Sequence, residues 1–238
     1  MKIETSLGPL CLSLFVVLGI IVSGFDAADA ASSDVRSQSG AVEKSQAEPV
    51  IVFIGDSLTQ GYGVRSEEAY PELVEKKLIR DGFKVKVING GISGSVTAEA
   101  DRRLRWYLKV KPKIVVLALG ANDGMKGTPP ETIEKNLTMA IDFAQANGII
   151  VLLSGIRMFS NLGPAYVKKF EAIFPDLAKR RHLALIPFLL EDVALQKELN
   201  QSDMRHPNAR GHEVIATRVA QKLEEILRQE EKEKETAK

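Results

Sequence analysis

Hydrophobic and polar positions alternate in blocks along the chain. Short runs of consecutive apolar residues, rich in Val and Ile, have the pattern of strands that are buried on both faces. The segments between them repeat their apolar residues at helical spacing. Strands are expected at Val50–Ile54, Val85–Ile88, Ile114–Leu119, Ile149–Leu153 and Leu183–Ile186, and helices at 67–80, 97–109, 130–146, 164–179 and 209–228.

This regular alternation of strands and helices predicts an α/β fold. Right-handed crossovers would place helices on both faces of a five-stranded parallel sheet, giving a three-layer α/β/α sandwich. In such folds the functional groups gather at the carboxyl ends of the strands. The segments that directly follow each strand are therefore where a site is expected.

The N-terminal segment differs from the rest of the chain. An apolar run from Leu7 to about Phe25 is followed by Ala28-Asp29-Ala30, a small-x-small cleavage pattern, so residues 1–30 are predicted to be a signal peptide. The alternative is an uncleaved anchor, since the run is close to the ~20 residues that span a bilayer. Residues 31–48 are expected to be a flexible leader, 49–230 one domain and 231–238 a charged tail. The protein would then be exported, either periplasmic or secreted, without stable membrane insertion once the signal is cleaved.

Composition narrows the range of partners. The chain has 238 residues, 45% of them hydrophobic, which suits one domain with a substantial core. Lys and Arg total 32 against 31 Asp and Glu, a net charge of +1, so no nucleic-acid partner is expected. The single cysteine, Cys11, lies in the apolar run, which leaves no disulfide in a cleaved chain. The last predicted helix has no sustained heptad pattern, so a monomer is expected.

Two distant segments together predict a serine nucleophile. Ser57 lies at the end of the first strand, but alone it could simply cap a turn. Some 150 residues later Asp203 and His206 stand with two residues between them, before Pro207, which keeps His206 out of helical conformation. A histidine that accepts the hydroxyl proton and a carboxylate that orients the ring are what a serine hydrolase requires.

The loops after the second and third strands are candidates for an oxyanion hole. They read Asn89-Gly90-Gly91-Ile92-Ser93-Gly94 and Gly120-Ala121-Asn122-Asp123. The backbone amides of Ser57 and Gly94 and the side-chain amide of Asn122 are the expected donors to the developing negative charge. Gly-rich turns and an Asn-Asp pair are also common in ordinary loops, so each segment alone is weak.

Taken together, the four segments resemble the SGNH/GDSL hydrolase family, in particular its branch of bacterial arylesterases, thioesterase I and lysophospholipase L1. The resemblance implies a flavodoxin-like sheet, nucleophile Ser57, oxyanion donors Ser57, Gly94 and Asn122, and triad partners Asp203 and His206. It implies no metal and no cofactor, in keeping with the absence of HExxH spacing. The chain departs from the family where Met204 replaces a frequent glycine and Ser95 a usual aspartate.

The function that follows is an exported serine esterase. It would act on small-molecule aryl or acyl esters, thioesters or lysophospholipids, with Tyr62, Val64, Phe159 and Phe188 as candidate substrate-binding residues. A carbohydrate O-acetyl esterase is the alternative enzyme. A non-catalytic binding module on the same fold is the alternative of another class. The remaining histidines, His182 and His212, are expected to be structural or solvent-facing.

Overall fold

The computed structural model describes residues 48–158 and 162–236, which belong to one compact unit, Ser45–Lys238. The predicted signal peptide and nearly all of the predicted leader lie outside the described residues. None of the described helices is both long enough and apolar enough to span a membrane. The strands are β1 (Val50–Gly55), β2 (Lys86–Gly91), β3 (Ile114–Ala118), β4 (Ile150–Ser154) and β5 (Ala184–Ile186). The α-helices are α1 (Ser57–Gln60), α2 (Tyr70–Arg80), α3 (Ala100–Tyr107), α4 (Ala121–Met125), α5 (Pro130–Ala146), α6 (Pro164–Arg181) and α7 (Ala209–Thr236). Short 3-10 turns are η1 (Ser66–Glu68), η2 (Thr97–Glu99), η3 (Leu108–Val110) and η4 (Lys197–Leu199).

The five strands form one parallel sheet in the order β2-β1-β3-β4-β5. This is the flavodoxin-like order, and it confirms the predicted fold class. From β1 the chain passes to β2 on one side of it. From β2 it crosses back past β1 to β3 on the other side. Loops that follow β1 and β3 therefore diverge, and they leave a crevice between them at the carboxyl edge of the sheet.

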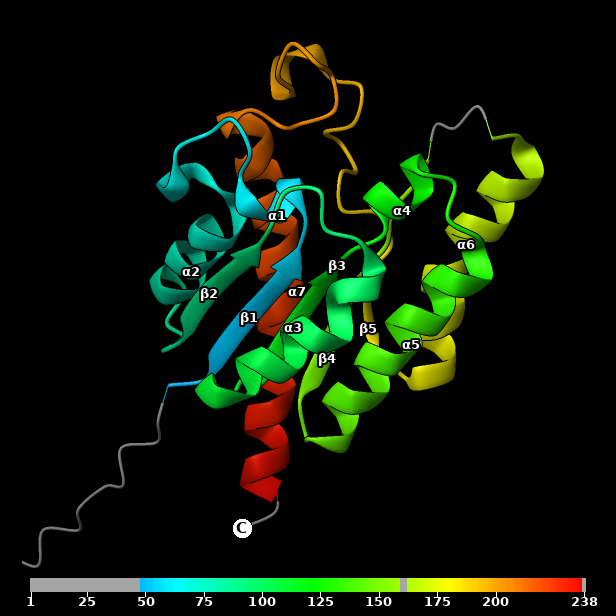
Figure 1. Cartoon of the computed structure of the whole chain (residues 1–238). Helices are drawn as coiled ribbons and strands as arrows, with labels where there is room; N and C mark the ends of the chain where they lie inside the picture. The colour runs from blue at the N-terminus through cyan, green and yellow to red at the C-terminus, as the bar shows by residue number, and fades with distance from the viewer. Residues whose placement is uncertain (1–47, 159–161, 237–238) are drawn as a thin grey trace, which may run out of the picture. The chain divides into compact units, whose positions relative to one another are not determined.

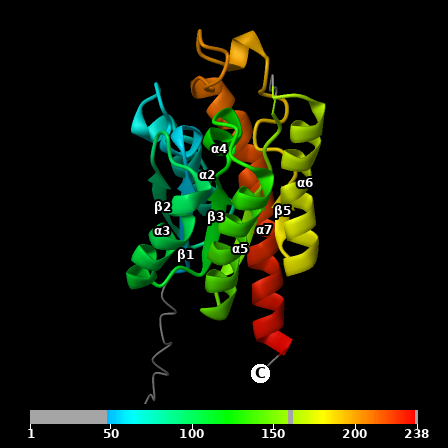
Figure 2. The same ribbon diagram turned by 45° about the vertical axis from the view of Figure 1, so that its right-hand side comes forward.

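Helices cover both faces of the sheet (Figure 1). Alternate residues of β1 show why: Ile51 and Phe53 pack in one core with α2 and α7, whereas Val52 and Ile54 pack in the other with α3, α5 and α6. All four side chains are fully buried. Figure 2 shows α7 on the side of the sheet opposite to α3 and α5. A strand buried on both faces must be apolar throughout, which explains the continuous runs seen in the sequence.

Most element ends lie within one or two residues of the prediction, and the larger differences are in β2, α7 and the helices expected at 67–80 and 97–109. β2 starts at Lys86 and runs on through Asn89 to Gly91, three residues beyond its apolar run. The helices expected at 67–80 and 97–109 are each divided by 3-10 turns. α7 continues to Thr236, so the charged residues 231–235, predicted as part of a tail, belong to this helix.

Candidate active site

Ser57 stands at the carboxyl end of β1, as the first residue of the short helix α1. The preceding residue, Asp56, caps this helix: its Oδ1 accepts a hydrogen bond of 3.0 Å from the amide of Leu58. The first amides of a helix have no partner within it, so the backbone N–H of Ser57 is well suited to bind an anion. The serine hydroxyl and an amide donor are thus presented together at the predicted edge of the sheet.

The predicted triad residues lie in a line of hydrogen bonds. His206 Nε2 is 3.0 Å from Ser57 Oγ, and His206 Nδ1 is 2.6 Å from Asp203 Oδ2. The hydrogen bond from His206, with those from backbone amides, lowers the pKa of Asp203 to about 2. Because the carboxylate is ionised and only accepts, Nδ1 carries the proton and Nε2 presents its lone pair to Ser57. This is the tautomer that a general base needs.

Asp203 also folds the loop that carries His206. Its second oxygen, Oδ1, accepts hydrogen bonds from the amides of both Arg205 and His206, at 2.9 and 3.1 Å. Gln201 ties this loop to the segment after α1, because its Nε2 donates to the carbonyl of Tyr62 at 2.6 Å. The imidazole therefore has its direction fixed from two sides, by the carboxylate and by the packing of Tyr62, whose ring centroid lies 4.7 Å away.

The loop that carries Gly94 is fastened to the helix that carries Ser57. Gln60 Oε1, at the end of α1, accepts hydrogen bonds from both the amide and the hydroxyl of Ser93, at 2.7 and 2.6 Å. Gly94 has φ +79°, a left-handed conformation that glycine adopts readily, and it lines the same cavity as Ser57. The predicted donor loop is thus held beside the nucleophile.

Ser95 anchors the other end of this loop. It is buried, and its hydroxyl donates to Glu99 Oε2 at 2.7 Å and accepts from Arg103 Nη1 at 3.0 Å. Its carbonyl accepts a 2.9 Å hydrogen bond from the side-chain amide of Asn122. The serine that replaces the usual aspartate is therefore well accommodated, and it orients the third predicted donor.

Asn122 and Asp123 have different structural partners although they are adjacent in α4. Asp123 is buried, and its two oxygens accept from the amide and the hydroxyl of Thr97 at 2.8 and 2.7 Å. Asn122 is half-buried and lines the cavity with Ser57. Asp123 thus fixes α4 to η2, while the amide of Asn122 is presented at the site.

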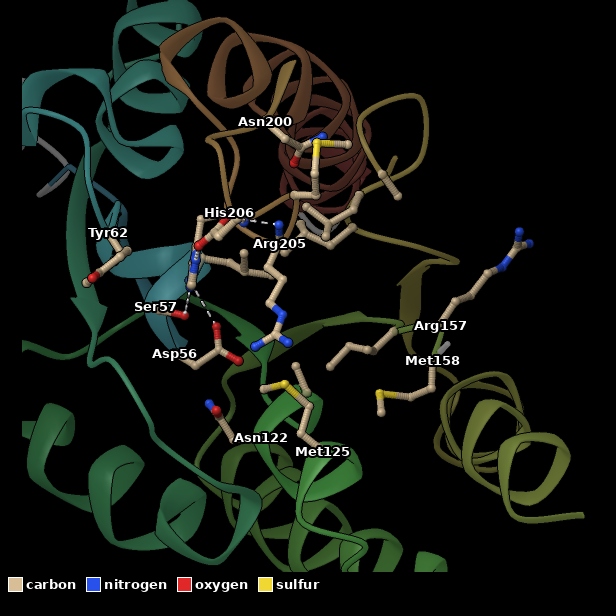
Figure 3. A pocket seen from close by; sticks show the side chains of 18 of the residues that line it. Asp56, Ser57, Tyr62, Asn122, Met125, Arg157, Met158, Asn200, Arg205 and His206 are labelled. Carbon is tan, nitrogen blue, oxygen red and sulfur yellow. Dashed lines mark hydrogen bonds and ion pairs between the residues drawn. The ribbon is translucent and has the colours of Figure 1, made fainter. Parts of the chain in front are cut away.

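A cavity of about 670 Å³ joins these groups. Figure 3 shows Ser57, Asp56 and His206 on one side of it and Arg157 and Met158 on the other. Most of its remaining wall is apolar and comes from the loops after β3, β4 and β5: Met125, Ile156, Met158, Phe188, Leu189, Leu190, Ala194 and Leu195. This size and character suit an organic ligand with a substantial apolar part.

The four predicted substrate-binding residues have different outcomes. Tyr62 and Phe188 line the cavity. Val64 does not, because it lies past a turn in which its amide donates to the carbonyl of Gly61. Phe159 lies outside the described residues.

Comparison with known proteins identifies the family. Residues 53–214 match the model of the GDSL-like lipase/acylhydrolase family. The chain belongs to this family. An arylesterase of Vibrio mimicus is 38% identical over 180 residues, which cover 75% of this chain and 90% of that protein. Thioesterase 1/protease 1/lysophospholipase L1 of Escherichia coli strain K12 is 34% identical over 185 residues, covering 77% and 88%.

Solved structures agree with this assignment. A psychrotrophic esterase from Pseudoalteromonas sp., in a structure inhibited by monoethylphosphonate, superposes with a TM-score of 0.72 at 31% identity, covering 76% of this chain and all of that one. The resemblance noted in the sequence and the predicted class, a carboxylic ester hydrolase, are both confirmed. The triad and oxyanion-hole residues were predicted from the motifs, and their proximity is a feature of this chain's own geometry.

Arg103 is a residue of this acylhydrolase that the motifs did not reveal. It is 5% exposed, and its guanidinium donates to the carbonyl of Gly55 at 2.9 Å, to Ser95 and to the carbonyl of Gly90. It therefore binds together the ends of β1 and β2 and the far end of the Gly94 loop, at Ser95. Burial lowers its pKa. Only its place on a helix face, visible in three dimensions, distinguishes it from Arg102 and Arg105.

The two other histidines lie away from Ser57. His212 is buried in α7, where its Nδ1 accepts from the amide of Tyr70 at 3.3 Å, and burial lowers its pKa to about 4. His182 is exposed at the end of α6. Among residues 48–158 and 162–236, no three His, Cys, Asp or Glu side chains converge as a metal site would require.

Proposed function

We propose that this acylhydrolase cleaves carboxylic esters through an acyl-enzyme on Ser57, with His206 as the base and Asp203 as its orienting carboxylate. The observation that carries the proposal is the continuous line from Ser57 Oγ to His206 Nε2, 3.0 Å, and from His206 Nδ1 to Asp203 Oδ2, 2.6 Å. A serine hydroxyl is a weak nucleophile until such a base receives its proton.

The reaction proceeds in two matching halves. Ser57 Oγ attacks the ester carbonyl while its proton passes to His206 Nε2, and the ionised Asp203 stabilises the imidazolium. The tetrahedral intermediate collapses, the alcohol or thiol leaves with the proton from His206, and the acyl group remains on Ser57. Water then attacks this ester with His206 as base again, which releases the carboxylic acid and restores the hydroxyl.

Three donors face the negative charge that forms on the carbonyl oxygen. They are the amides of Ser57 and Gly94 and the side chain of Asn122. The position of these donors supports this role. Hydrogen bonds between Gln60 and Ser93, Ser95 and Asn122, and Thr97 and Asp123 join α1, the Gly94 loop and α4. Donors held in place before the reaction need no reorganisation, and the loss of one such donor costs about 2.7–4 kcal/mol of transition-state stabilisation.

The substrates are aryl or acyl esters with an apolar part, including thioesters and lysophospholipids. The relatives' names carry these activities, and the largely apolar cavity supports them. An enzyme confined to acetyl groups on carbohydrate has little use for an apolar wall of this extent. We therefore rank the O-acetyl esterase second.

Ser57→Ala and Asp203→Asn test the triad together. In Ser57→Ala, kcat for p-nitrophenyl esters should fall roughly 10⁶-fold, because the nucleophile is absent and only binding and the oxyanion donors remain. In Asp203→Asn, kcat should fall roughly 10⁴-fold, since the wrong tautomer of His206 then faces Ser57. Unchanged melting temperatures would show that both proteins fold. Full activity in Ser57→Ala would disprove the assignment.

We further propose that the enzyme is exported and that residues 1–30 are removed. The support is the sequence alone: an apolar run followed by a small-x-small site at Ala28-Asp29-Ala30. Mass spectrometry of protein produced in a secreting bacterial host should find a mature N-terminus at Ala31. An intact N-terminus in the membrane fraction would instead indicate an uncleaved anchor.

A further inference from the structure

Two apolar residues at the cavity have an unusual backbone conformation. Leu195 has φ +64° and Met204 has φ +56°, in the left-handed region that side chains with a Cβ atom avoid. Both line the cavity that contains Ser57, and both are exposed, at 62% and 37%. Each therefore combines two unfavourable features, a strained backbone and apolar surface in water.

The local hydrogen bonds explain the strain at Met204. Its amide donates to the carbonyl of Gln201 at 3.0 Å, and Asp203 Oδ1 accepts from the next two amides, those of Arg205 and His206. This turn is needed to present His206, and glycine would satisfy it without strain. The turn accounts for the backbone conformation, but it does not account for the methionine side chain.

Leu195 and Met204 differ from the other residues with positive φ in the polarity and the place of their side chains. Within residues 48–158 and 162–236, the other non-glycine residues with positive φ are Lys111, His182 and Asp192. Lys111 and His182 end helical segments η3 and α6. All three carry polar side chains that water can solvate. The two apolar cases both lie at the catalytic cavity, which indicates that their side chains serve a ligand.

The surroundings identify the chemistry of that ligand. Met125 and Tyr62 line the same cavity and are also exposed, at 57% and 52%. Ile156 and Met158, which are partly buried, line it as well. Apolar side chains therefore line both partly buried and exposed parts of the cavity. A ligand that covers them has an apolar part, beside the polar cavity residues Arg157, Asn200 and Arg205.

We propose that Leu195 and Met204 form an apolar lip that covers the aliphatic chain of the ester and sets the enzyme's preference for longer chains. This inference rests on the proposed function, because it names the substrate class of the same site. The chain can belong to the acyl group or to the alcohol. Both sources share the chemistry that the lip would recognise, so the experiment has one arm for each.

The test measures kcat/KM for p-nitrophenyl esters from acetate to decanoate and for acetate esters from ethyl to decyl. In Met204→Gly and Leu195→Gly, the ratio of long-chain to short-chain kcat/KM should fall several-fold in one of the two series. About four-fold is expected for each methylene group that loses its apolar cover. The series that responds identifies the part of the ester that lies under the lip.

Alanine variants separate the side chain from the backbone. Met204→Ala removes the side chain but keeps the strain, so its long-to-short ratio should fall as in Met204→Gly. Only the glycine variant should gain stability, with a melting temperature about 2–4 °C higher. Lys111→Gly is the matched control: it relieves the same strain away from the cavity and should raise the melting temperature without altering the ratio.

Two results would overturn the proposal of an apolar lip. One is an unchanged long-to-short ratio in both ester series for all the Leu195 and Met204 variants. The other is an equal loss at every chain length, which would mean that Met204 acts only on the position of His206. Failure of the proposed function is distinct from both, because wild-type and Ser57→Ala proteins would then show the same rates on every ester.

Discussion

Asp56 is a buried carboxyl group next to Ser57, the proposed nucleophile. It is 2% exposed, and desolvation raises its pKa to about 6, although the hydrogen bond from the Leu58 amide opposes the shift. An ordinary aspartate in the unfolded chain titrates near pH 3.9. The folded protein therefore binds the extra proton between about pH 4 and pH 6, and this contribution to stability is lost as the pH rises through 6.

Asp56→Asn removes this titration but keeps an oxygen that can cap α1. Above pH 6 the wild type carries a buried charge that the variant lacks, so the variant's stability relative to wild type should improve by roughly 2–3 kcal/mol from pH 4 to pH 8. Urea unfolding at both pH values measures this change. The same difference in stability at both pH values would contradict the shifted pKa.

His212 acts in the opposite direction over the same range. Its folded pKa of about 4 lies below its ordinary value of 6.5, because burial disfavours the charged ring. The unfolded state therefore binds more protons between about pH 4 and 6.5, and stability falls as the pH drops through this window. The two groups partly offset each other in the wild type. His212 is present in both proteins, so its contribution cancels in the comparison with Asp56→Asn.

At the scale of elements, two glycines at the end of β2 allow close approach to α1 and to β1. A Cβ atom on Gly91 would come within 2.1 Å of the backbone nitrogen of Gln60, and one on Gly90 within 2.6 Å of the carbonyl of Phe53. These are backbone atoms, which cannot move aside as the end of a flexible side chain can. Gly91 must therefore lack a side chain for the helix with Ser57 to keep its place, and Gly90 must lack one for β2 to pair closely with β1.

Gly91→Ala should consequently displace α1 and reduce activity together with stability. We expect a loss of about 1–3 kcal/mol, the usual cost of overpacking, and a large fall in kcat because Ser57 moves relative to His206. Thermal unfolding and ester hydrolysis measure the two effects. Gly82→Ala is a useful comparison: the positive φ of Gly82 should cost stability there, but the space around it is open, so the activity of this variant should stay near wild type.

The elements that the sequence predicted and those it missed differ in their physical signal. Buried strands and amphipathic helices have long periodic patterns, and α5 matches its expected bounds of Pro130–Ala146. α1 and α4 have only four and five residues, too short to show a period. β2 ends in Asn89, Gly90 and Gly91, which pair with β1 but carry no hydrophobic pattern that would indicate a strand.

At the scale of the whole molecule, the motifs predicted which residues would meet, but not what holds them. Ser57, His206 and Asp203 follow from motif spacing, and the sheet order places their loops at one edge. The supporting bonds, such as Arg103 to the carbonyl of Gly55 and Gln60 to Ser93, join residues whose proximity only the folded chain creates. The residues of the cavity wall were harder still to predict, since the paths of the loops after β4 and β5 decide which side chains line the cavity.

The site also draws its members from the two ends of the fold. Ser57 follows the first strand, while His206 lies just before the last helix, 149 residues further along the chain. Closing so long a loop comes late when folding proceeds from local contacts to distant ones. If His206 is the base, as proposed, Ser57 has none until α7 packs on the sheet beside α2, and we expect no hydrolytic activity before that step. The time course of recovered esterase activity should therefore report the final step of refolding, because a partly folded chain is inactive.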